Sequence, residues 1–213
     1  MKEKNIHSAV DIFDKYAISY QTKYMDGKKY HPSLNLFISS LSKVDAHILE
    51  LACGPGNITK YLLSQNPSLD ILVTDLSPAM LELAKENNPN ASIQMLDCRS
   101  ILELNEKYDA ILCGFGLPYI SKEEAILMIR DASISLNKNG LIYISTMEDD
   151  YDKSGFKASS SDPNEGLHMY FHEAEYLVNA MSSNGFEIID LSRVQYLDDK
   201  GEDVVDLIII GKK

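Results

Sequence analysis

The stretch that decides the fold is HILELACGPGNIT, residues 47–59. Its first part is a short apolar run typical of a buried strand, and a turn with Gly54 and Gly56 separates that run from a helical pattern. Glycines at the carboxyl end of a parallel strand let the chain turn tightly and let a ligand approach the bare main chain. The stretch therefore predicts a strand, a turn and a helix of the nucleotide-binding kind, with an ordinary strand-to-helix turn as the alternative.

Short apolar runs alternate with helical periodicity from residue 46 to residue 147. The predicted strands cover residues 47–52, 69–75, 91–97, 108–114 and 140–146, and the predicted helices between them cover residues 58–64, 78–87 and 122–136. Ser77 and Pro78 provide an N-cap and a first-turn proline for one of these helices. Because the strands are apolar on both faces and helices separate them, the sequence predicts a parallel sheet covered on both sides.

The two ends of the chain break this alternation. After a helix at about residues 173–183, residues 185–197 and 202–213 read as strands joined by the turn DDKG, which leaves no room for a helix. Such a short connection predicts an antiparallel hairpin. Residues 8–25 and 33–44 read as two helices that precede the sheet, and residues 148–169 as one long irregular segment.

The composition fits one globular domain of 213 residues. Twenty basic residues against 32 acidic ones leave a net charge of -12, which repels nucleic acid and anionic lipid surfaces. The longest apolar runs are too short to cross a bilayer, and the first residues do not form a secretory signal, so we expect a cytoplasmic protein that binds neither membrane nor nucleic acid. Three cysteines without a C-x-x-C pair indicate reduced thiols.

Acidic residues end the second and third predicted strands. Asp75 lies 19 residues after Gly56, where a carboxylate can accept hydrogen bonds from both hydroxyls of a ribose. Asp97 lies at the corresponding end of the next strand. The alternative for Asp75 is a helix cap, and the alternative for Asp97 is a turn-forming role. Together with the glycines, these carboxylates place polar or flexible groups at one edge of the sheet and favour a nucleotide-like ligand.

A nicotinamide-dependent dehydrogenase would share these features, and three details favour another family. Glu50 lies four residues before Gly54, Thr59 takes the place of a third glycine, and the chain closes with the hairpin. With its motif LELACGPGN, residues 49–57, the chain resembles the class I S-adenosylmethionine-dependent methyltransferases over about residues 10–211. Ala52 stands where that family commonly has its first glycine, and we expect it to keep a negative φ.

The resemblance implies an α/β fold with a Rossmann-like seven-stranded mixed sheet, in the order 3-2-1-4-5-7-6, with the last strand antiparallel and helices on both faces. It divides the single domain into an N-terminal helical lid (1–45), a cofactor-binding core (46–147), a substrate-side insertion (148–172), and a final helix with the hairpin (173–213). The implied cofactor is S-adenosyl-L-methionine, with S-adenosyl-L-homocysteine as the product.

The resemblance also implies cofactor-binding residues. They are Gly54 and Gly56 beside the methionine part, with Glu50 and Asn57 in the same motif, Asp75 on the ribose, Leu76 and Met80 on the adenine, Asp97 with Cys98 at the adenine amino group, and Gly114 and Phe115 beside the methionine end. Tyr16 and Tyr20, four residues apart on a predicted helix, are expected to cover the cofactor, with core packing as the alternative.

Tyr119, His168 and His172 are candidate substrate contacts, and either histidine is also a candidate base, with a capping or surface role as the alternative for the histidines. The two histidines are spaced like metal ligands on a helix, but no glutamate follows the first and no third ligand is evident, so no metal site is predicted. The loop CGFGLPYI lacks the Asn/Asp-Pro-Pro-aromatic motif of methyltransferases that act on bases or amides. With the acidic charge, this favours a small soluble acceptor.

O-, N- and S-methylation, the presence of a general base and the oligomeric state are left open by the sequence. The alternatives to a methyltransferase are a nicotinamide-dependent oxidoreductase and a non-catalytic module that binds S-adenosylmethionine.

Overall fold

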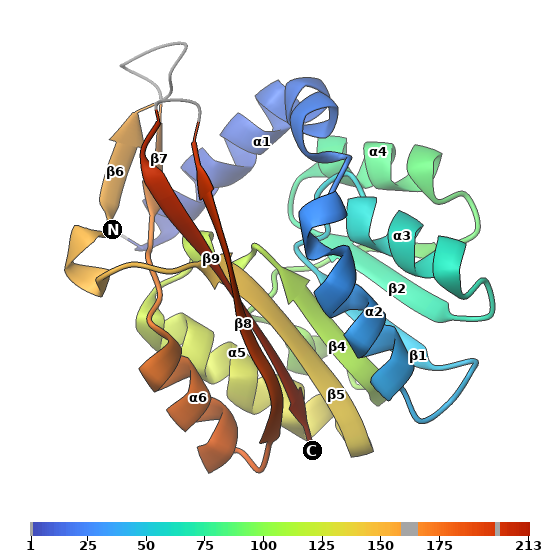
Figure 1. The fold of residues 1–213 in the computed structure, drawn as a ribbon. Helices are drawn as coiled ribbons and strands as arrows, with labels where there is room; N and C mark the ends of the chain where they lie inside the picture. Colours follow the sequence, from blue (N-terminus) through green and yellow to red (C-terminus); the bar gives the residue numbers. More distant parts are fainter. Residues whose placement is uncertain (1, 159–165, 199–200) are drawn as a thin grey trace.

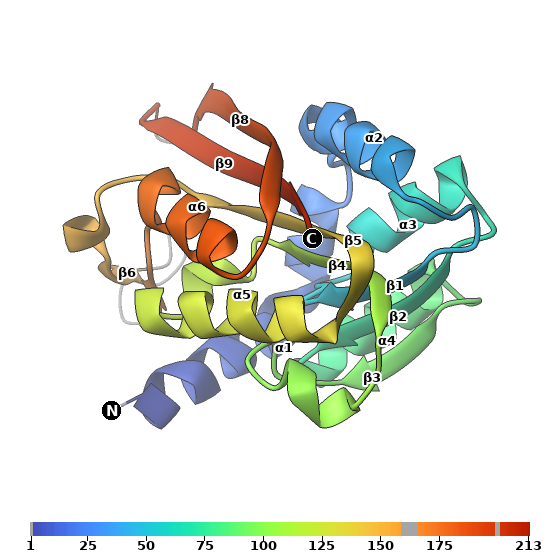
Figure 2. The same ribbon diagram turned by 90° about the horizontal axis from the view of Figure 1, so that it is seen from below.

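The computed structural model describes residues 2–158, 166–198 and 201–213, and it consists of a central sheet between two layers of helices (Figures 1 and 2). The sheet contains β1 (His47–Leu51), β2 (Asp70–Asp75), β3 (Ser92–Met95), β4 (Tyr108–Gly114), β5 (Leu136–Met147), β8 (Glu187–Leu197) and β9 (Asp203–Lys212). The α-helices are α1 (Lys2–Tyr24), α2 (His31–Ser40), α3 (Asn57–Gln65), α4 (Pro78–Asn87), α5 (Lys122–Ser135) and α6 (Ala174–Ser183). The short 3-10 turns used below are η1 (Lys28–Tyr30), η3 (Leu117–Tyr119) and η4 (Tyr151–Lys153).

The order of the strands across the sheet is β3-β2-β1-β4-β5-β9-β8. Strand β9 runs antiparallel to β5 on one side and to β8 on the other, whereas the pairs among the first five strands are parallel. The predicted mixed sheet of seven strands, with its last strand antiparallel, is therefore confirmed. All residues of β4 before its final glycine are buried, as expected for a strand covered on both faces.

Two apolar clusters form the core, one on each face of the sheet. On one face, α5 and α6 supply Met128, Ile129 and Met181. On the other face, α2 and α3 supply Phe37 and Leu62, and α4 packs beside them. Helices α3 to α6 lie within two residues of their predicted bounds, because their ends carry local signals such as the Ser77 side chain that caps α4. The first two helices differ more, since α1 begins before the predicted residue 8 and α2 ends at Ser40, before the predicted residue 44.

The segment at 148–169, expected to be irregular, contains regular structure instead. It begins with the turn η4, and β6 (Gly155–Ala158) then pairs with β7 (Gly166–Met169) as a separate antiparallel hairpin. Residues 159–165 of the expected segment lie outside the described residues. Strand pairing depends on the partner strand more than on intrinsic preference, so four-residue strands of mixed composition escape detection in the sequence.

Helix α1 lies across the carboxyl ends of the parallel strands and packs against α4 and β7 (Figure 1). Asp14 joins α1 to the N-terminus of α4. One of its carboxylate oxygens accepts two hydrogen bonds, one from the Ser77 hydroxyl and one from the Ala79 amide at 3.1 Å. Tyr16 has non-helical backbone angles (φ -111°, ψ 16°), so α1 is two helical pieces joined at a kink. Within the described residues, we find no helix with the length and apolarity needed to span a membrane.

Candidate functional site

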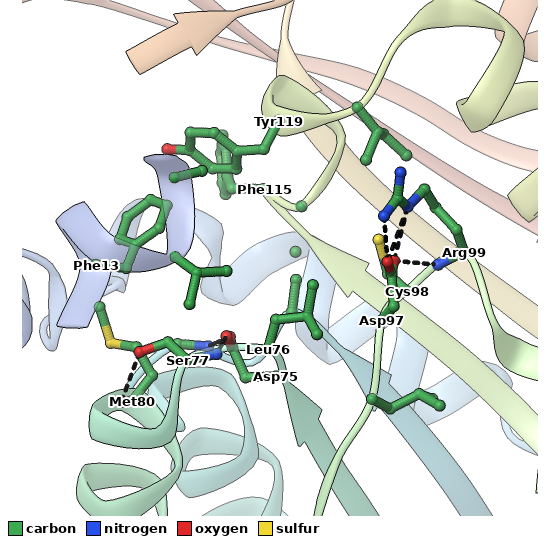
Figure 3. Close-up of a pocket in the computed structure, with 18 of the residues that line it drawn as sticks. Phe13, Asp75, Leu76, Ser77, Met80, Asp97, Cys98, Arg99, Phe115 and Tyr119 are labelled. Carbon is green, nitrogen blue, oxygen red and sulfur yellow. Dashed lines mark hydrogen bonds and ion pairs between the residues drawn. The ribbon is translucent and has the colours of Figure 1, made fainter. Parts of the chain in front are cut away.

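A cavity lies where α1 covers the carboxyl ends of β1, β2 and β4 and the chain just after β3, and it contains about 770 Å³ of space, part of it open to solvent (Figure 3). Cavities of this size are typical of small-molecule sites. Its lining residues come from five parts of the chain: Ala9, Val10, Phe13 and Tyr20; Ala52 and Gly54; Asp75, Leu76, Ser77 and Met80; Leu96, Asp97, Cys98 and Arg99; and Gly114, Phe115, Gly116, Tyr119 and Ile120.

The turn after β1 has three residues in the left-handed region, Ala52 (φ 50°), Gly54 (φ 55°) and Gly56 (φ 75°). The expectation that Ala52 keeps a negative φ is therefore wrong. A non-glycine residue in this region costs about 1–2 kcal/mol, because its Cβ approaches the following carbonyl oxygen. The turn must reverse direction within a few residues between a buried strand and a helix, and such strain is typical of ligand-binding turns.

The two glycines of this turn have different surroundings. Gly54 lines the cavity, and a Cβ placed on it would lie 3.7 Å from the ring of Tyr20, so the main chain there is open to a ligand. Gly56 does not line the cavity. A Cβ placed on it would collide with the Asn88 amide and lie 3.2 Å from Ala84 of α4. Gly56 therefore allows α3 and α4 to pack closely, which is a role that spacing alone does not reveal.

Asp75 joins the two turns that border the cavity. One of its carboxylate oxygens accepts a hydrogen bond from the Gly54 amide at 2.8 Å, and the other accepts one from the Ser77 amide at 2.9 Å. Burial raises the pKa of Asp75, and these amide hydrogen bonds partly oppose that effect. The carboxylate lines the cavity with its orientation fixed, as the assignment to ribose hydroxyls requires.

A second carboxylate lies on the opposite wall in Figure 3. The Arg99 Nε atom donates to both oxygens of Asp97, at 2.9 and 3.0 Å, and its Nη1 atom donates to Glu124 at 3.1 Å. Burial alone would raise the pKa of Asp97, but the hydrogen bonds and charge of Arg99 hold it below the usual value. Burial raises the pKa of the adjacent Cys98 thiol, so this wall presents an ionised carboxylate beside a neutral thiol.

Aromatic side chains from α1 and from the chain after β4 form a third wall. The ring of Phe13 makes edge-to-face contacts with Tyr20 at 5.6 Å and with Tyr119 at 4.9 Å. Burial raises the pKa of both tyrosines, so their hydroxyls stay protonated and can donate hydrogen bonds. Phe115 also lines this wall and has a φ of 58°.

Three other residues assigned to the cofactor by resemblance lie outside the cavity lining. Glu50 is buried behind the glycine turn, where its carboxylate accepts a hydrogen bond from the Thr59 hydroxyl of α3. Burial raises its pKa to about 7. Asn57 donates to the Tyr24 carbonyl at 3.3 Å, which ties α3 to the end of α1. The kink at Tyr16 interrupts the four-residue helical spacing between Tyr16 and Tyr20. Tyr20 lines the cavity, and Tyr16 does not.

The two candidate histidines lie outside the cavity as well. His172 is fully buried, with Nε2 2.8 Å from the Leu117 carbonyl and Nδ1 hydrogen-bonded to the Tyr176 hydroxyl. Burial lowers its pKa to about 4, so it is neutral near pH 7. His168 lies on β7, with its ring 4.6 Å from that of Tyr170. In the described part of the chain, no three metal-binding side chains of His, Cys, Asp or Glu gather at one point.

The structure adds lining residues that the sequence analysis did not single out. Phe13 lies one heptad before Tyr20, so a two-turn aromatic spacing could have indicated it. Gly116 was visible in the GFG stretch, and a Cβ there would lie 2.9 Å from the Ala52 Cβ. Arg99 had no pattern to indicate it, because its place depends on the contact with Asp97. The cofactor-binding roles themselves stay predictions.

Residues 48–140 match the protein family described as a methyltransferase domain. Over 102 residues, the chain is 33% identical to the malonyl-[acyl-carrier protein] O-methyltransferase of Acetivibrio thermocellus, a match that covers 47% of this chain and 36% of that relative. It is 24% identical over 212 residues to the tRNA N(3)-methylcytidine methyltransferase trm141 of Schizosaccharomyces pombe, covering 90% of this chain and 85% of that protein. For this O-methyltransferase and two other curated relatives, the match spans only 32–39% of the relative's own length.

Among solved structures, the chain is similar to the Burkholderia thailandensis 1,6-didemethyltoxoflavin-N1-methyltransferase with bound 1,6-didemethyltoxoflavin and S-adenosylhomocysteine. The TM-score is 0.73 at 18% identity, covering 100% of this chain and 90% of that one. At this identity the likeness concerns the fold. The family match spans the glycine turn and both acidic strand ends, so residues 48–140 belong to a methyltransferase domain, and the fold around them is that of S-adenosylmethionine-dependent methyltransferases.

Proposed function

We propose that the protein is a methyltransferase that uses S-adenosylmethionine to methylate a small soluble acceptor. The observation that carries this proposal is the cavity at the carboxyl ends of the parallel strands. Its walls hold Asp75 next to bare main chain at Gly54, and Asp97 on the opposite side. The family and the fold agree with it, whereas the activity of the whole protein is our inference.

The lining residues fit this cofactor in charge and shape. The Asp75 carboxylate would accept both ribose hydroxyls, and the ionised Asp97 would accept the adenine amino group. Leu76, Met80 and Leu96 supply apolar surface for a flat base. Gly54 presents main chain without a side chain in the way, which suits the methionine part of the cofactor.

When bound, S-adenosylmethionine supplies a methyl group that is already electrophilic, because it is attached to a positively charged sulfur. The chain's own residues then have to orient the acceptor and exclude water. Phe13 and Tyr20 line the cavity from α1, and Tyr119 lines it from the chain after β4, in contact with Phe13. Orientation of this kind is worth about 7–11 kcal/mol in favourable cases. The protonated hydroxyls of Tyr20 and Tyr119 can donate hydrogen bonds, which suits positioning better than proton removal.

The alternatives fit less well. A nicotinamide-dependent oxidoreductase of the usual doubly wound type has strands in the order 3-2-1-4-5-6, whereas here the antiparallel β9 is inserted between β5 and β8. A non-catalytic binding module would share the cofactor site but would transfer no methyl group. A small acceptor is favoured over nucleic acid by the net charge of -12.

Calorimetric titration with S-adenosylhomocysteine, and separately with the reduced nicotinamide dinucleotide, tests the cofactor. We expect binding of the first and none of the second. Incubation of the protein with S-adenosylmethionine labelled in its methyl group and a mixture of small metabolites then tests transfer. Label in a small product is the expected result. Binding without transfer to any acceptor would favour the non-catalytic module, and failure to bind S-adenosylhomocysteine would contradict the proposal.

A further inference from the structure

A lysine ammonium lies between two aromatic rings and a buried carboxylate beside the cavity. Lys29 belongs to the turn η1, and its Nζ atom is 3.1 Å from a carboxylate oxygen of Asp206. The same nitrogen lies 3.3 Å from the ring centroid of Tyr196 and 4.9 Å from that of Tyr30. We call these four residues the Asp206 cluster. They come from η1, β8 and β9, which only the tertiary fold brings together.

The carboxylate at the base of this cluster is withdrawn from solvent. The Asp206 side chain is 1% exposed, whereas that of its partner Lys29 is 39% exposed. The Tyr30 hydroxyl donates to Asp206 at 2.6 Å and helps to hold it in place. Removing the cation from a buried carboxylate costs stability, so Asp206 favours another cation in place of the Lys29 ammonium over a neutral or anionic group.

The cluster adjoins the cavity of the proposed methyltransferase site. The ring of Tyr30 lies 5.1 Å from that of Phe115, which lines the cavity wall next to Gly114. The ring of Tyr196 is on the solvent side, with 36% of the residue exposed. The cluster therefore has one side at the solvent and is joined to the cavity wall by the contact between Tyr30 and Phe115.

Two aromatic rings and a carboxylate are the groups that recognise an ammonium ion. In this structure they hold an ammonium that is tethered by a flexible four-carbon chain and partly exposed, so it can leave without unfolding its segment. The neighbouring Lys28 provides a contrast, because its partner Asp26 is 64% exposed and the pair lies at the surface. Of the two adjacent lysines, Lys29 is the one whose ammonium occupies a built site.

From these observations we infer that the Asp206 cluster is a subsite for a cationic group, an alkylammonium, on the methyl acceptor, and that Lys29 occupies it until the acceptor binds. The inference rests on the proposed function for the identity of the acceptor, but not for the existence of the site. The net charge of -12 favours the approach of such a cation over that of an anion.

The test uses tetramethylammonium as the probe and Lys29→Gln to remove the tethered competitor. We expect tetramethylammonium to bind Lys29→Gln at least about tenfold more tightly than wild type, measured by NMR titration, because the emptied cluster keeps its rings and its carboxylate. Lys28→Gln is the matched control and should bind like wild type. Tertiary butanol, of similar size but neutral, should bind none of the three proteins measurably.

A second variant assigns the binding to the cluster. Tyr196→Leu in the Lys29→Gln background should return the affinity to the wild-type level, and partial exposure of Tyr196 makes this change tolerable for folding. Thermal unfolding gives an independent measure, since tetramethylammonium should raise the Tm of Lys29→Gln more than that of wild type. Equal affinities in Lys29→Gln and Lys28→Gln, or full affinity after Tyr196→Leu, would overturn the subsite.

Calorimetry with S-adenosylhomocysteine separates this inference from the proposed function. Lys29 lies outside the cofactor residues, so Lys29→Gln should bind S-adenosylhomocysteine as wild type does. If neither protein bound it, the proposed function would fail, while the tetramethylammonium titration would still decide whether the Asp206 cluster is an ammonium site.

Discussion

At the scale of single residues, Asp75 combines a structural position with the ligand-binding position that we propose for it. Its two oxygens accept the Gly54 and Ser77 amides, and its carboxylate still borders the cavity. A side chain that both shapes the turn and contacts the ligand leaves few tolerated substitutions, because a change affects the geometry of the site together with its charge.

We predict that Asp75→Ala removes most of the affinity for S-adenosylhomocysteine. A hydrogen bond to a charged group is worth about 1.5–3 kcal/mol, and two ribose hydroxyls would lose their acceptor, so the affinity should fall by about a hundredfold or more. Calorimetry measures the loss. Asp75→Asn is the control, since it can still accept an amide hydrogen bond but lacks the charge, and circular dichroism of both variants checks the fold. Unchanged affinity in Asp75→Ala would disprove the assignment to ribose.

Glu50 offers a prediction about pH, because burial raises its pKa from 4.5 to about 7. A carboxyl whose pKa is higher in the folded state stabilises the fold fully below its unfolded pKa, and that contribution is lost as the pH rises through its folded pKa. The free energy of unfolding should therefore fall between about pH 4.5 and 7, by up to about 3 kcal/mol from this residue.

Glu50→Gln keeps an oxygen for the Thr59 hydroxyl and removes the titration. Urea unfolding at several pH values should show a flatter profile in this variant, and its stability relative to wild type should increase with pH across that window. Glu82→Gln on the exposed side of α4 is the control and should keep the wild-type profile. A parallel profile for Glu50→Gln and wild type would show that Glu50 does not titrate in this range.

At the scale of elements, α1 covers one side of the cavity. It contributes Phe13 and Tyr20 to the lining, and Asp14 ties it to the N-terminus of α4. A helix N-terminus favours a negative charge, so this contact holds α1 at the point where α4 begins next to Asp75. The tie consists of the hydrogen bonds that Asp14 accepts from Ser77 and Ala79, and so few bonds are compatible with the proposal that α1 moves for ligand exchange.

We predict that S-adenosylhomocysteine slows hydrogen exchange in residues 10–25 of wild type. Asp14→Ala should speed exchange in that segment without ligand and weaken S-adenosylhomocysteine binding about threefold to tenfold, because it removes the hydrogen bonds that join α1 to Ser77 and Ala79 at the start of α4. Asp11→Ala, an exposed acidic residue of the same helix, is the control and should change neither. Exchange that is the same with and without ligand, combined with full activity in a Tyr16→Phe, Tyr20→Phe double variant, would reduce this face of α1 to core packing.

At the scale of the whole molecule, the net charge of -12 limits the partners the protein can hold. One relative at 24% identity is a tRNA methyltransferase, so the comparison leaves nucleic acid to be tested. Binding to a phosphate backbone draws most of its free energy from the release of counterions by basic side chains. Because acidic residues outnumber basic ones by 32 to 20, we expect this chain to gain little from that release.

We predict that the chain does not bind tRNA detectably at physiological salt. Filter binding measures this, with lower salt as the more permissive condition and methyl incorporation into bulk tRNA as the functional readout. A basic tRNA-binding domain assayed in the same buffer controls for the integrity of the RNA. Retention of tRNA at physiological salt, or labelled tRNA after incubation with methyl-labelled S-adenosylmethionine, would contradict the proposal of a small acceptor.

The sheet was predictable because its signals are local. Buried parallel strands read as apolar runs, and a connection such as DDKG is too short for anything but a hairpin, so strands β1 to β5, β8 and β9 could be placed. The hairpin of β6 and β7 could not, because its pairing depends on contacts between segments that carry little intrinsic preference. The positive φ of Ala52 could not be predicted from the sequence either, since it depends on the whole turn between β1 and α3.

The sequence by itself determined the order of the elements and the presence of acidic residues at the carboxyl ends of the parallel strands, because period and turn chemistry act over a few residues. Only the tertiary structure decided which candidates border the cavity. It places Tyr20, Asp75 and Asp97 there and leaves Glu50 and His172 behind it. Periodicity tells which face of an element is buried, but the neighbour that covers that face comes from distant parts of the chain.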